Sequence, residues 1–321
     1  MSRKRFAAVI FAVVSLFVSM PQVGAQEATG GSGLIISPTR AEYTINPGKA
    51  DNIQVTLKNI SGSDITAKAV VNDFEADNDS GEPRVLVDAK SDSANSVKNF
   101  LVGVTDIPLK KDETKKFDIP IQIPAGTASG AYYGVIRFTA VTAQKQENGA
   151  EKQVALNASL GLIVLIQVPG SITEQIQAQK IAVDRNGSNG SVFIAGPQHA
   201  NISLKNIGNG FSKPYGRVII KRGNTEVFTY EMNDTDPRSN VLPNSSRTFK
   251  QDIKNVNALG RYTATANISY GSGGDIITLK TTFWVFPLWF VITVSVVLLV
   301  LVIVGLLLYR RINRKRKRHA K

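Results

Sequence analysis

The chain has 321 residues, no cysteine and a formal net charge of +13. Three basic residues near its N-terminus and eight after Tyr309 account for most of that charge, which leaves the segment between them at +2. The absence of cysteine excludes thiol nucleophiles, thiolate zinc sites and disulfides, and the near-neutral middle offers no basic patch for nucleic acid. We therefore expect no nucleic-acid partner and an exported region stabilised by its hydrophobic cores alone.

The N-terminal segment has the pattern of a secretory signal peptide. Basic residues Arg3, Lys4 and Arg5 precede an apolar run at 6–18, and the small residues VGA follow at 23–25. The run is short for a spanning helix, which disfavours the alternative of a retained N-terminal anchor. We predict a signal peptide at 1–25, cleaved after Ala25, and a flexible linker at 26–32.

The middle of the chain alternates apolar and polar residues with a period of two, which is typical of half-buried β-strands. The alternation is clearest at 52–58, 119–123 and 201–205, and clusters of Gly, Pro, Asn, Asp and Ser separate such segments. Short strands at this spacing predict an all-β ectodomain. We expect two tandem immunoglobulin-like β-sandwiches, at 33–168 and 171–283, joined by a hinge at 169–170.

An internal repeat supports two domains of one kind. The motif LKNISG at 57–62 returns as LKNIG at 204–208, and GAY at 130–132 returns as GRY at 260–262. A tyrosine at the start of a late strand is typical of the tyrosine corner in Greek-key sandwiches. The pattern predicts that Leu57 and Leu204 occupy equivalent buried positions.

The segment 154–168 is the most apolar part of the chain outside the C-terminal region. A fully buried strand is favoured over an exposed interaction edge, because exposed apolar edges promote aggregation. A second membrane span is disfavoured by its short apolar core.

The C-terminal segment has the pattern of a transmembrane helix. The 21 residues at 288–308 contain no charged side chain, enough for about 30 Å of helix. We predict a helix at 286–309, with Trp284 and Trp289 at the outer membrane interface and Tyr309 at the inner one. A basic tail at 310–321 follows, with a stop-transfer cluster of Arg310, Arg311, Arg314, Lys315, Arg316, Lys317 and Arg318. The positive-inside rule predicts a single-pass type I protein of the cell membrane, with a cytoplasmic tail that contacts lipid and an ectodomain that faces the cell wall.

A set of short motifs in the first predicted domain carries a family resemblance. They are ISPTR at 36–40, PG at 47–48, VTLKN at 55–59, NDF at 72–74, IPL at 107–109, KKF at 115–117, IPAG at 123–126 and GAYYG at 130–134. With these motifs the segment resembles the peptidoglycan-binding domain of the WxL-interacting surface proteins of Gram-positive bacteria. The resemblance implies cell-wall association. The second domain shares no motif with the family's host-binding domain.

The same opening is also similar to the first domain of pilus chaperones. In that family a Thr-Arg pair, matched here by Thr39 and Arg40, supplies an arginine that anchors a client's C-terminal carboxylate. The partner lysine of that family has no counterpart, because 155–168 contains neither lysine nor arginine. The similarity therefore predicts a shared fold, with Arg40 as a candidate ligand or partner contact. For wall polymer, Arg40 is interpreted more simply as a solvated surface charge.

Residues that would carry catalysis are sparse. His199, the one histidine of the predicted ectodomain, belongs to no recognisable triad or zinc motif and is interpreted as a surface or strand-edge residue. The acidic segment at 77–82 lacks the bidentate glutamate of a calcium loop and predicts an ordinary turn. LPNSS at 242–246 lies too far from the membrane to act as a sortase signal. We expect a non-enzymatic protein without a cofactor or metal.

These observations favour a membrane-anchored surface protein, an adhesin or scaffold that binds cell-wall polymer or another envelope protein. The alternative is a tethered chaperone-like module that captures an exported client by β-strand addition.

Overall fold

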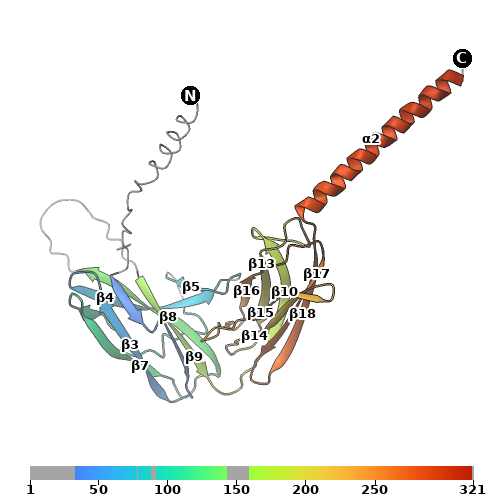
Figure 1. Ribbon diagram of the computed structural model, residues 1–321. Helices are drawn as coiled ribbons and strands as arrows, with labels where there is room; N and C mark the ends of the chain where they lie inside the picture. The colour runs from blue at the N-terminus through green and yellow to red at the C-terminus, as the bar shows by residue number, and fades with distance from the viewer. Residues whose placement is uncertain (1–32, 78, 88–91, 143–158, 320–321) are drawn as a thin grey trace, which may run out of the picture.

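The computed structural model describes residues 33–77, 79–87, 92–142 and 159–319 and forms two β-sandwiches followed by one long helix (Figure 1). This arrangement confirms the predicted all-β fold with two immunoglobulin-like sandwiches. The predicted signal peptide and linker lie outside the described residues.

Domain 1 consists of two sheets packed face to face. One has the strand order β1-β3-β7, and the other has the order β2-β9-β8-β4-β5, with β6 also paired to β4. Their strands are β1 (Leu34–Ser37), β2 (Arg40–Thr44), β3 (Ala50–Asn59), β4 (Ile65–Ala76), β5 (Pro83–Leu86), β6 (Ile107–Leu109), β7 (Thr114–Gln122), β8 (Gly130–Thr142) and β9 (Ser159–Val168).

The chain crosses from one sheet of domain 1 to the other between β1 and β2. β1 pairs antiparallel with β3, whereas β2 pairs parallel with β9 through Arg40↔Ile163. This crossing closes the sandwich around its apolar core and places Arg40 on the outer face of the second sheet, because its neighbour Ala41 faces the core.

Domain 2 repeats the two-sheet plan. The sheets have the orders β11-β10-β13-β16 and β12-β18-β17-β14-β15. Their strands are β10 (Ile176–Arg185), β11 (Ser188–Asn189), β12 (Val192–Phe193), β13 (His199–Asn206), β14 (Tyr215–Arg222), β15 (Thr225–Met232), β16 (Ser246–Asp252), β17 (Gly260–Tyr270) and β18 (Asp275–Val285). β18 runs two residues past the boundary predicted at 283.

The sequence repeat is also a structural repeat. Leu57 and Leu204 are fully buried, each in the core of its own domain, as predicted. Two residues later, Asn59 and Asn206 are buried and use their side chains alike. Asn59 donates to the carbonyls of Ser63 and Lys110 and accepts from the amide of Ser61. Asn206 donates to Gly210 and Val241 and accepts from Gly208. The asparagine therefore fixes the turn that follows it.

The predicted tyrosine corners are present in both domains. Tyr132 donates its hydroxyl hydrogen to the carbonyl of Ala128 at 2.9 Å, and Tyr262 donates to that of Ala258 at 2.9 Å. Each bond satisfies the one polar atom of a large aromatic side chain and fixes the chain as it enters the strand.

β9 is a buried strand, as its composition predicts. It pairs with β8 along its length and with β2 over Ile163–Gln167. Leu162, Val164, Ile166 and Val168 are buried in the core of domain 1. The alternate residues Ile163 and Leu165 point to the other face, which domain 2 partly covers. Both faces are thus covered, which explains a continuous apolar run.

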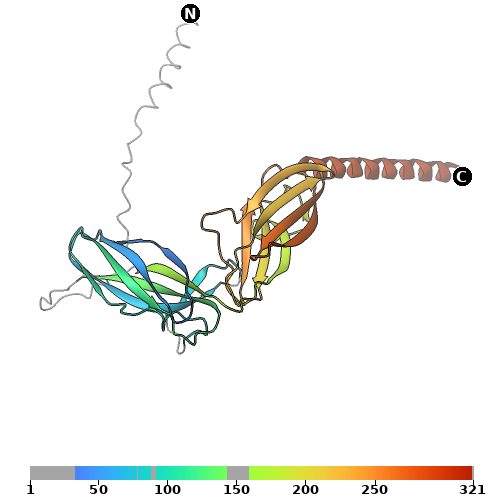
Figure 2. The ribbon, with the colours of Figure 1, turned by 90° about the horizontal axis from the view of Figure 1, so that it is seen from below.

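The helix α2 (Leu288–His319) leaves domain 2 at the end farthest from domain 1 (Figure 2). Among the described residues it is the one helix that is long and apolar enough to cross a membrane. Its span is Leu288–Arg311, and the most apolar 18 residues have a mean hydropathy of 3.3 and are not buried against the protein. Its two interior hydroxyl groups bond within the helix, from Thr293 to Trp289 and from Ser295 to Val291. They therefore present no unsatisfied donor to an apolar surrounding.

Candidate functional site

An apolar seam joins the two domains. Phe74, Tyr133, Val135 and Leu165 of domain 1 form one buried cluster with Leu242 of domain 2. The ring of Phe211, from domain 2, lies with its centroid 6.2 Å from that of Tyr133. The two sandwiches therefore share a small core in addition to their own.

Hydrogen bonds flank this seam on both sides. The amide of Ala131 donates to the carbonyl of Asn209 at 2.9 Å, and the amide of Thr248 donates to the carbonyl of Asp79 at 3.0 Å. The amide of Phe211 donates to the side-chain oxygen of Gln167. Such directional bonds fix the orientation of the domains, which an apolar contact alone does less well.

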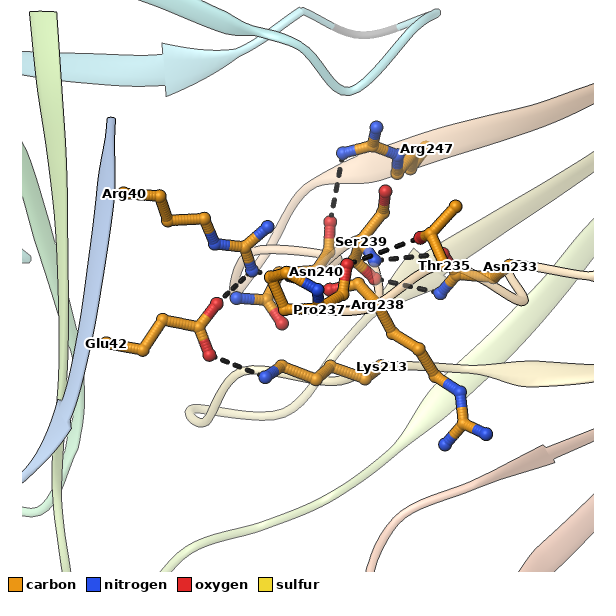
Figure 3. A network of polar contacts seen from close by, with 10 residues as sticks. All are labelled: Arg40, Glu42, Lys213, Asn233, Thr235, Pro237, Arg238, Ser239, Asn240 and Arg247. Carbon is orange, nitrogen blue, oxygen red and sulfur yellow. Dashed lines mark hydrogen bonds and ion pairs between the residues drawn. The ribbon is translucent and has the colours of Figure 1, made fainter. Parts of the chain in front are cut away.

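An ionic chain crosses the domain boundary beside the seam (Figure 3). Arg40 forms an ion pair with Glu42, and the other carboxylate oxygen of Glu42 lies 2.5 Å from Lys213 Nζ in domain 2. Arg40 also donates to the carbonyl of Arg238 at 3.4 Å. The interpretation of Arg40 as a solvated surface charge is therefore wrong, because the fold brings domain 2 over the outer face of β2.

A second arginine approaches the same place from β16. Arg247 donates to the carbonyls of Gly81 in domain 1 and Asn240 in domain 2, each at 3.2 Å. Burial lowers the pKa of its guanidinium, the nearby charge of Glu82 opposes this, and the positive charge of Arg40 adds to the lowering. No carboxylate of the described residues lies within ion-pair distance of Arg247.

Arg40, Asn240 and Arg247 line a small hollow of about 70 Å³. Within the described residues, Arg40 Nε and both polar atoms of the buried Asn240 side chain lack a hydrogen-bond partner. Buried donors without a partner cost free energy, so this place favours a ligand that supplies acceptors. The apolar part of the wall comes from Phe74, Ile163, Leu165 and Leu242.

A loop of domain 2 holds the residues that face Arg40. Asn233 donates to the carbonyl of Pro214. It also donates to the carbonyl of Ser239 and accepts from the amide of Ser239 (Figure 3). Thr235 closes the intervening turn by donating to the carbonyl of Pro237. The loop is thus fixed by side-chain bonds, and the hollow is preformed.

Two guanidinium groups line the hollow, and only that of Arg40 forms an ion pair with a carboxylate among the described residues. The charge of Arg247 is therefore available to an anionic ligand, although Glu82 lies near it. Charge-assisted bonds to a carboxylate are the strongest that arginine forms. An open cleft of about 560 Å³ adjoins the hollow and shares Leu165 and Asn240 with it. The site therefore fits a carboxylate at the end of an apolar segment.

Comparison with known proteins gives similarity in fold. No family model matches the chain, and no curated protein sequence matches it. The solved structures that resemble it include the class 5 fimbriae chaperone CfaA, with 14% identity and a TM-score of 0.39 over 78% of this chain and 98% of that one. Another is the Escherichia coli chaperone DraB, with 13% identity and a TM-score of 0.36 over 78% of this chain and 96% of that chaperone. The Pseudomonas aeruginosa chaperone CupB2 has 9% identity and a TM-score of 0.35 over 78% and 100%.

These neighbours belong to the more distant of the two groups that the sequence resembles. No match supports the WxL-interacting family. At this level the similarity concerns the fold alone, so the function is argued below from this chain's own residues.

The membrane-related aromatic residues lie near the start of α2 and within it. Trp284 is the penultimate residue of β18, and Trp289 lies in the first turn of α2. Both side chains are exposed, as is that of Tyr309, the third predicted anchor. Arg310 and Arg311 continue the same helix, which does not end at the predicted boundary. Side chains beyond Arg311 lie outside the described residues.

His199 opens β13 and lies between two carboxylates. Its Nδ1 is 2.9 Å from an oxygen of the buried Asp184, and its Nε2 is 3.4 Å from one of Asp252. Asn201 donates to the other oxygen of Asp184 at 2.6 Å. The histidine thus belongs to a half-buried polar cluster that joins the ends of β10 and β13, which the sequence pattern did not indicate.

Acidification is expected to destabilise domain 2 through Asp184. Burial alone would raise the pKa of this carboxyl, but the bonds from His199 and Asn201 and the charge of His199 outweigh burial and lower it. A carboxyl with a lowered pKa stabilises the fold above its unfolded pKa, and that contribution is lost as the pH falls through the folded pKa. The melting temperature of domain 2 should therefore decrease as the pH is lowered below about 4. This decrease should be less steep in the Asp184→Asn variant. The exposed Asp252→Asn variant should keep the original slope.

Two other sequence features resolve as ordinary structure. Asp77 accepts from the amides of Asp79 and Ser80, which makes the acidic segment a self-capped turn. In LPNSS, Leu242 is buried in the seam and accepts a bond from Ser245. Both segments are used to build the domain boundary.

Proposed function

We propose that the protein is a membrane-tethered binding module that captures an extended segment of another envelope protein between its two domains. The hollow formed by Arg40, Asn240 and Arg247 carries this proposal, because its unpartnered donors and two guanidinium groups suit a terminal carboxylate. This is the chaperone-like alternative considered from the sequence, with Arg247 in place of the missing lysine.

The edge of β9 offers a place for the rest of the segment. β2 covers this edge only from Ile163 onward, and within the described residues no strand pairs with Ser159, Leu160, Gly161 or Leu162 on that side. A segment that adds here parallel to β9, in line with β2, ends beside Arg40. Backbone bonds then supply affinity, and the hollow fixes the register.

Binding of matched peptides tests the proposal. The full chain in lipid nanodiscs is titrated with a labelled peptide of alternating apolar residues that carries either a free C-terminal carboxylate or an amide. We expect the acid to bind about tenfold more tightly, since a charged hydrogen bond contributes about 1.5–3 kcal/mol. Arg247→Gln and Asn240→Ala should remove the preference for the acid over the amide. Arg40→Lys should reduce this preference without removing it.

Arg217→Ala is the matched control, because this exposed arginine pairs with Glu231 on β14–β15 and lies outside the hollow. Equal affinity for acid and amide, or a preference that survives Arg247→Gln, would contradict carboxylate capture.

The same proposal includes a type I orientation at the cell membrane. It is supported by the apolar span and the basic residues that follow it. Protease added to intact cells should degrade domains 1 and 2 and spare the tail, and a protected ectodomain would contradict this orientation.

Binding of cell-wall polymer is the second candidate. A broad open groove of about 880 Å³ has several polar side chains along β10, β13 and β16, among them Lys180, Asn201, Ser203, Thr248 and Lys250. Co-sedimentation with purified peptidoglycan tests it, and the Lys180→Ala and Lys250→Ala variants should reduce the bound fraction.

A further inference from the structure

The end of domain 2 from which α2 emerges exposes apolar side chains next to the helix. Val192 is 57% exposed, Ile194 is 53% exposed and Trp284 is 44% exposed. Leu288 and Trp289 continue this surface onto the helix. We call Val192, Ile194 and Trp284 the membrane-proximal patch. Exposed apolar groups that adjoin one another mark an interaction surface.

The patch is rigidly joined to the start of the helix. β12 pairs parallel with β18 through Val192↔Trp284. The amide of Trp284 donates to Ser191, and the amide of Phe286 donates to Phe193, both at 2.8 Å. The buried Phe193 packs on Phe283 in the core, so its neighbours Val192 and Ile194 must point outward.

Aromatic rings extend the patch along the helix. Trp284 stacks on Phe286 with centroids 5.8 Å apart, and Phe286 stacks on Phe290 at 6.0 Å. Trp289 meets Phe290 edge to face. Trp side chains prefer the boundary between lipid headgroups and acyl chains.

Exposed basic residues lie at the ends of β14 and β17 and in the loop after β16, at the same end of the domain. Arg261 pairs with Trp284 across β17–β18, and Arg222 lies opposite Tyr262 on the adjacent strand. Lys254 follows Ile253, whose amide bonds to Gln198 in the chain that leads from the patch. The carboxylates that the structure describes at this end are Glu226 on the β14–β15 hairpin and two beside His199, the exposed Asp252 and the buried Asp184.

We propose that this end of domain 2 rests on the lipid surface, with Val192 and Ile194 inserted at the headgroup boundary and Arg222, Lys254 and Arg261 over anionic headgroups. Continuity with α2 identifies the occupant, because a bilayer around the helix also reaches the segment at 191–194, which is hydrogen-bonded to Trp284 and Phe286 just before the helix begins. The basic residues match the negative potential of anionic lipid. Such seating fixes the direction in which domain 2 presents the cleft.

The cysteine-free chain permits a direct test. The full chain with Val192→Cys or Ile194→Cys is labelled with an environment-sensitive fluorophore and reconstituted in vesicles that contain anionic lipid. We expect blue-shifted emission and strong quenching by lipids with a shallow spin label. Ile276→Cys is the control, because Ile276 is 70% exposed and lies near the opposite end of the domain. If the label at 192 and 194 behaves like the label at 276, the proposal is overturned.

A second set of variants tests the charges. With the label at 194, replacing Arg222, Lys254 and Arg261 by Gln should weaken quenching in anionic vesicles and leave it unchanged in zwitterionic ones. The matched control replaces three exposed lysines of domain 1, Lys49, Lys58 and Lys116, by Gln. It should leave the quenching unchanged in both anionic and zwitterionic vesicles. Unchanged quenching of the first triple variant in anionic vesicles would overturn the role of the basic residues.

Discussion

Replacing Leu57 by alanine is expected to lower the free energy of unfolding of domain 1 by about 2–5 kcal/mol, as deletion of a fully buried leucine does. Leu57 has no solvent exposure and lies in the core between the two sheets. Its strand neighbours on either side are Ile36 and Lys115, so β1, β3 and β7 should loosen together.

Hydrogen exchange measured peptide by peptide is the suitable readout, because both tryptophans lie at the end of domain 2 or in the helix. Protection in β3 and β7 should fall, while β13 and β16 keep theirs. Ile60→Ala, at an exposed position three residues away, should change stability by less than about 0.5 kcal/mol. If both domains lose protection equally, the seam makes them one cooperative unit, contrary to our expectation of two separate cores.

Replacing Asn206 by leucine should destabilise domain 2 by about 3–5 kcal/mol. The change removes bonds to two carbonyls and one amide, those of Gly210, Val241 and Gly208. Each buried backbone group left without a partner costs about 1–3 kcal/mol, and the added apolar burial offsets only part of this.

The effect should extend to the domain boundary, because the turn after Asn206 carries Asn209 and Phe211 into contact with domain 1. We expect faster hydrogen exchange at 207–211 and at 241–245. We also expect weaker binding of the carboxylate peptide. Asn267→Leu, at an exposed position in the same domain, should change neither the hydrogen exchange nor the binding of the peptide. Normal exchange in Asn206→Leu would contradict the assigned role of the side chain.

Most of the architecture is encoded in local patterns. Alternation of apolar residues specifies which face of each strand is buried, and the repeated LKNI and Gly-x-Tyr motifs mark equivalent strands in the two domains. The tyrosine corners, the buried β9 and the apolar helix follow from these patterns, since each depends on neighbours a few residues away or on composition alone.

The candidate site has no such local signature. Arg40 meets the carbonyl of Arg238 at a sequence separation of 198 residues, and Arg247 meets Gly81 at 166. Asn240 and Lys213 lie in loops whose composition suggests only turns. The absence of a lysine from 155–168 therefore does not leave Arg40 as the one cation at this place, because Arg247 of the other domain lines the same hollow.

Local patterns alone predict the export and anchor segments, and they also predict the strand faces and tandem sandwiches that the structure confirms. The partial burial of Arg40, the small core shared by the two domains and the position of Val192 and Ile194 beside the helix depend instead on how distant segments pack together. The physical reason is that burial within a strand follows from side-chain period and hydrophobicity, which act over a few residues. The electrostatic surroundings of a residue depend instead on which distant segments the packed sheets bring within a few ångströms of it.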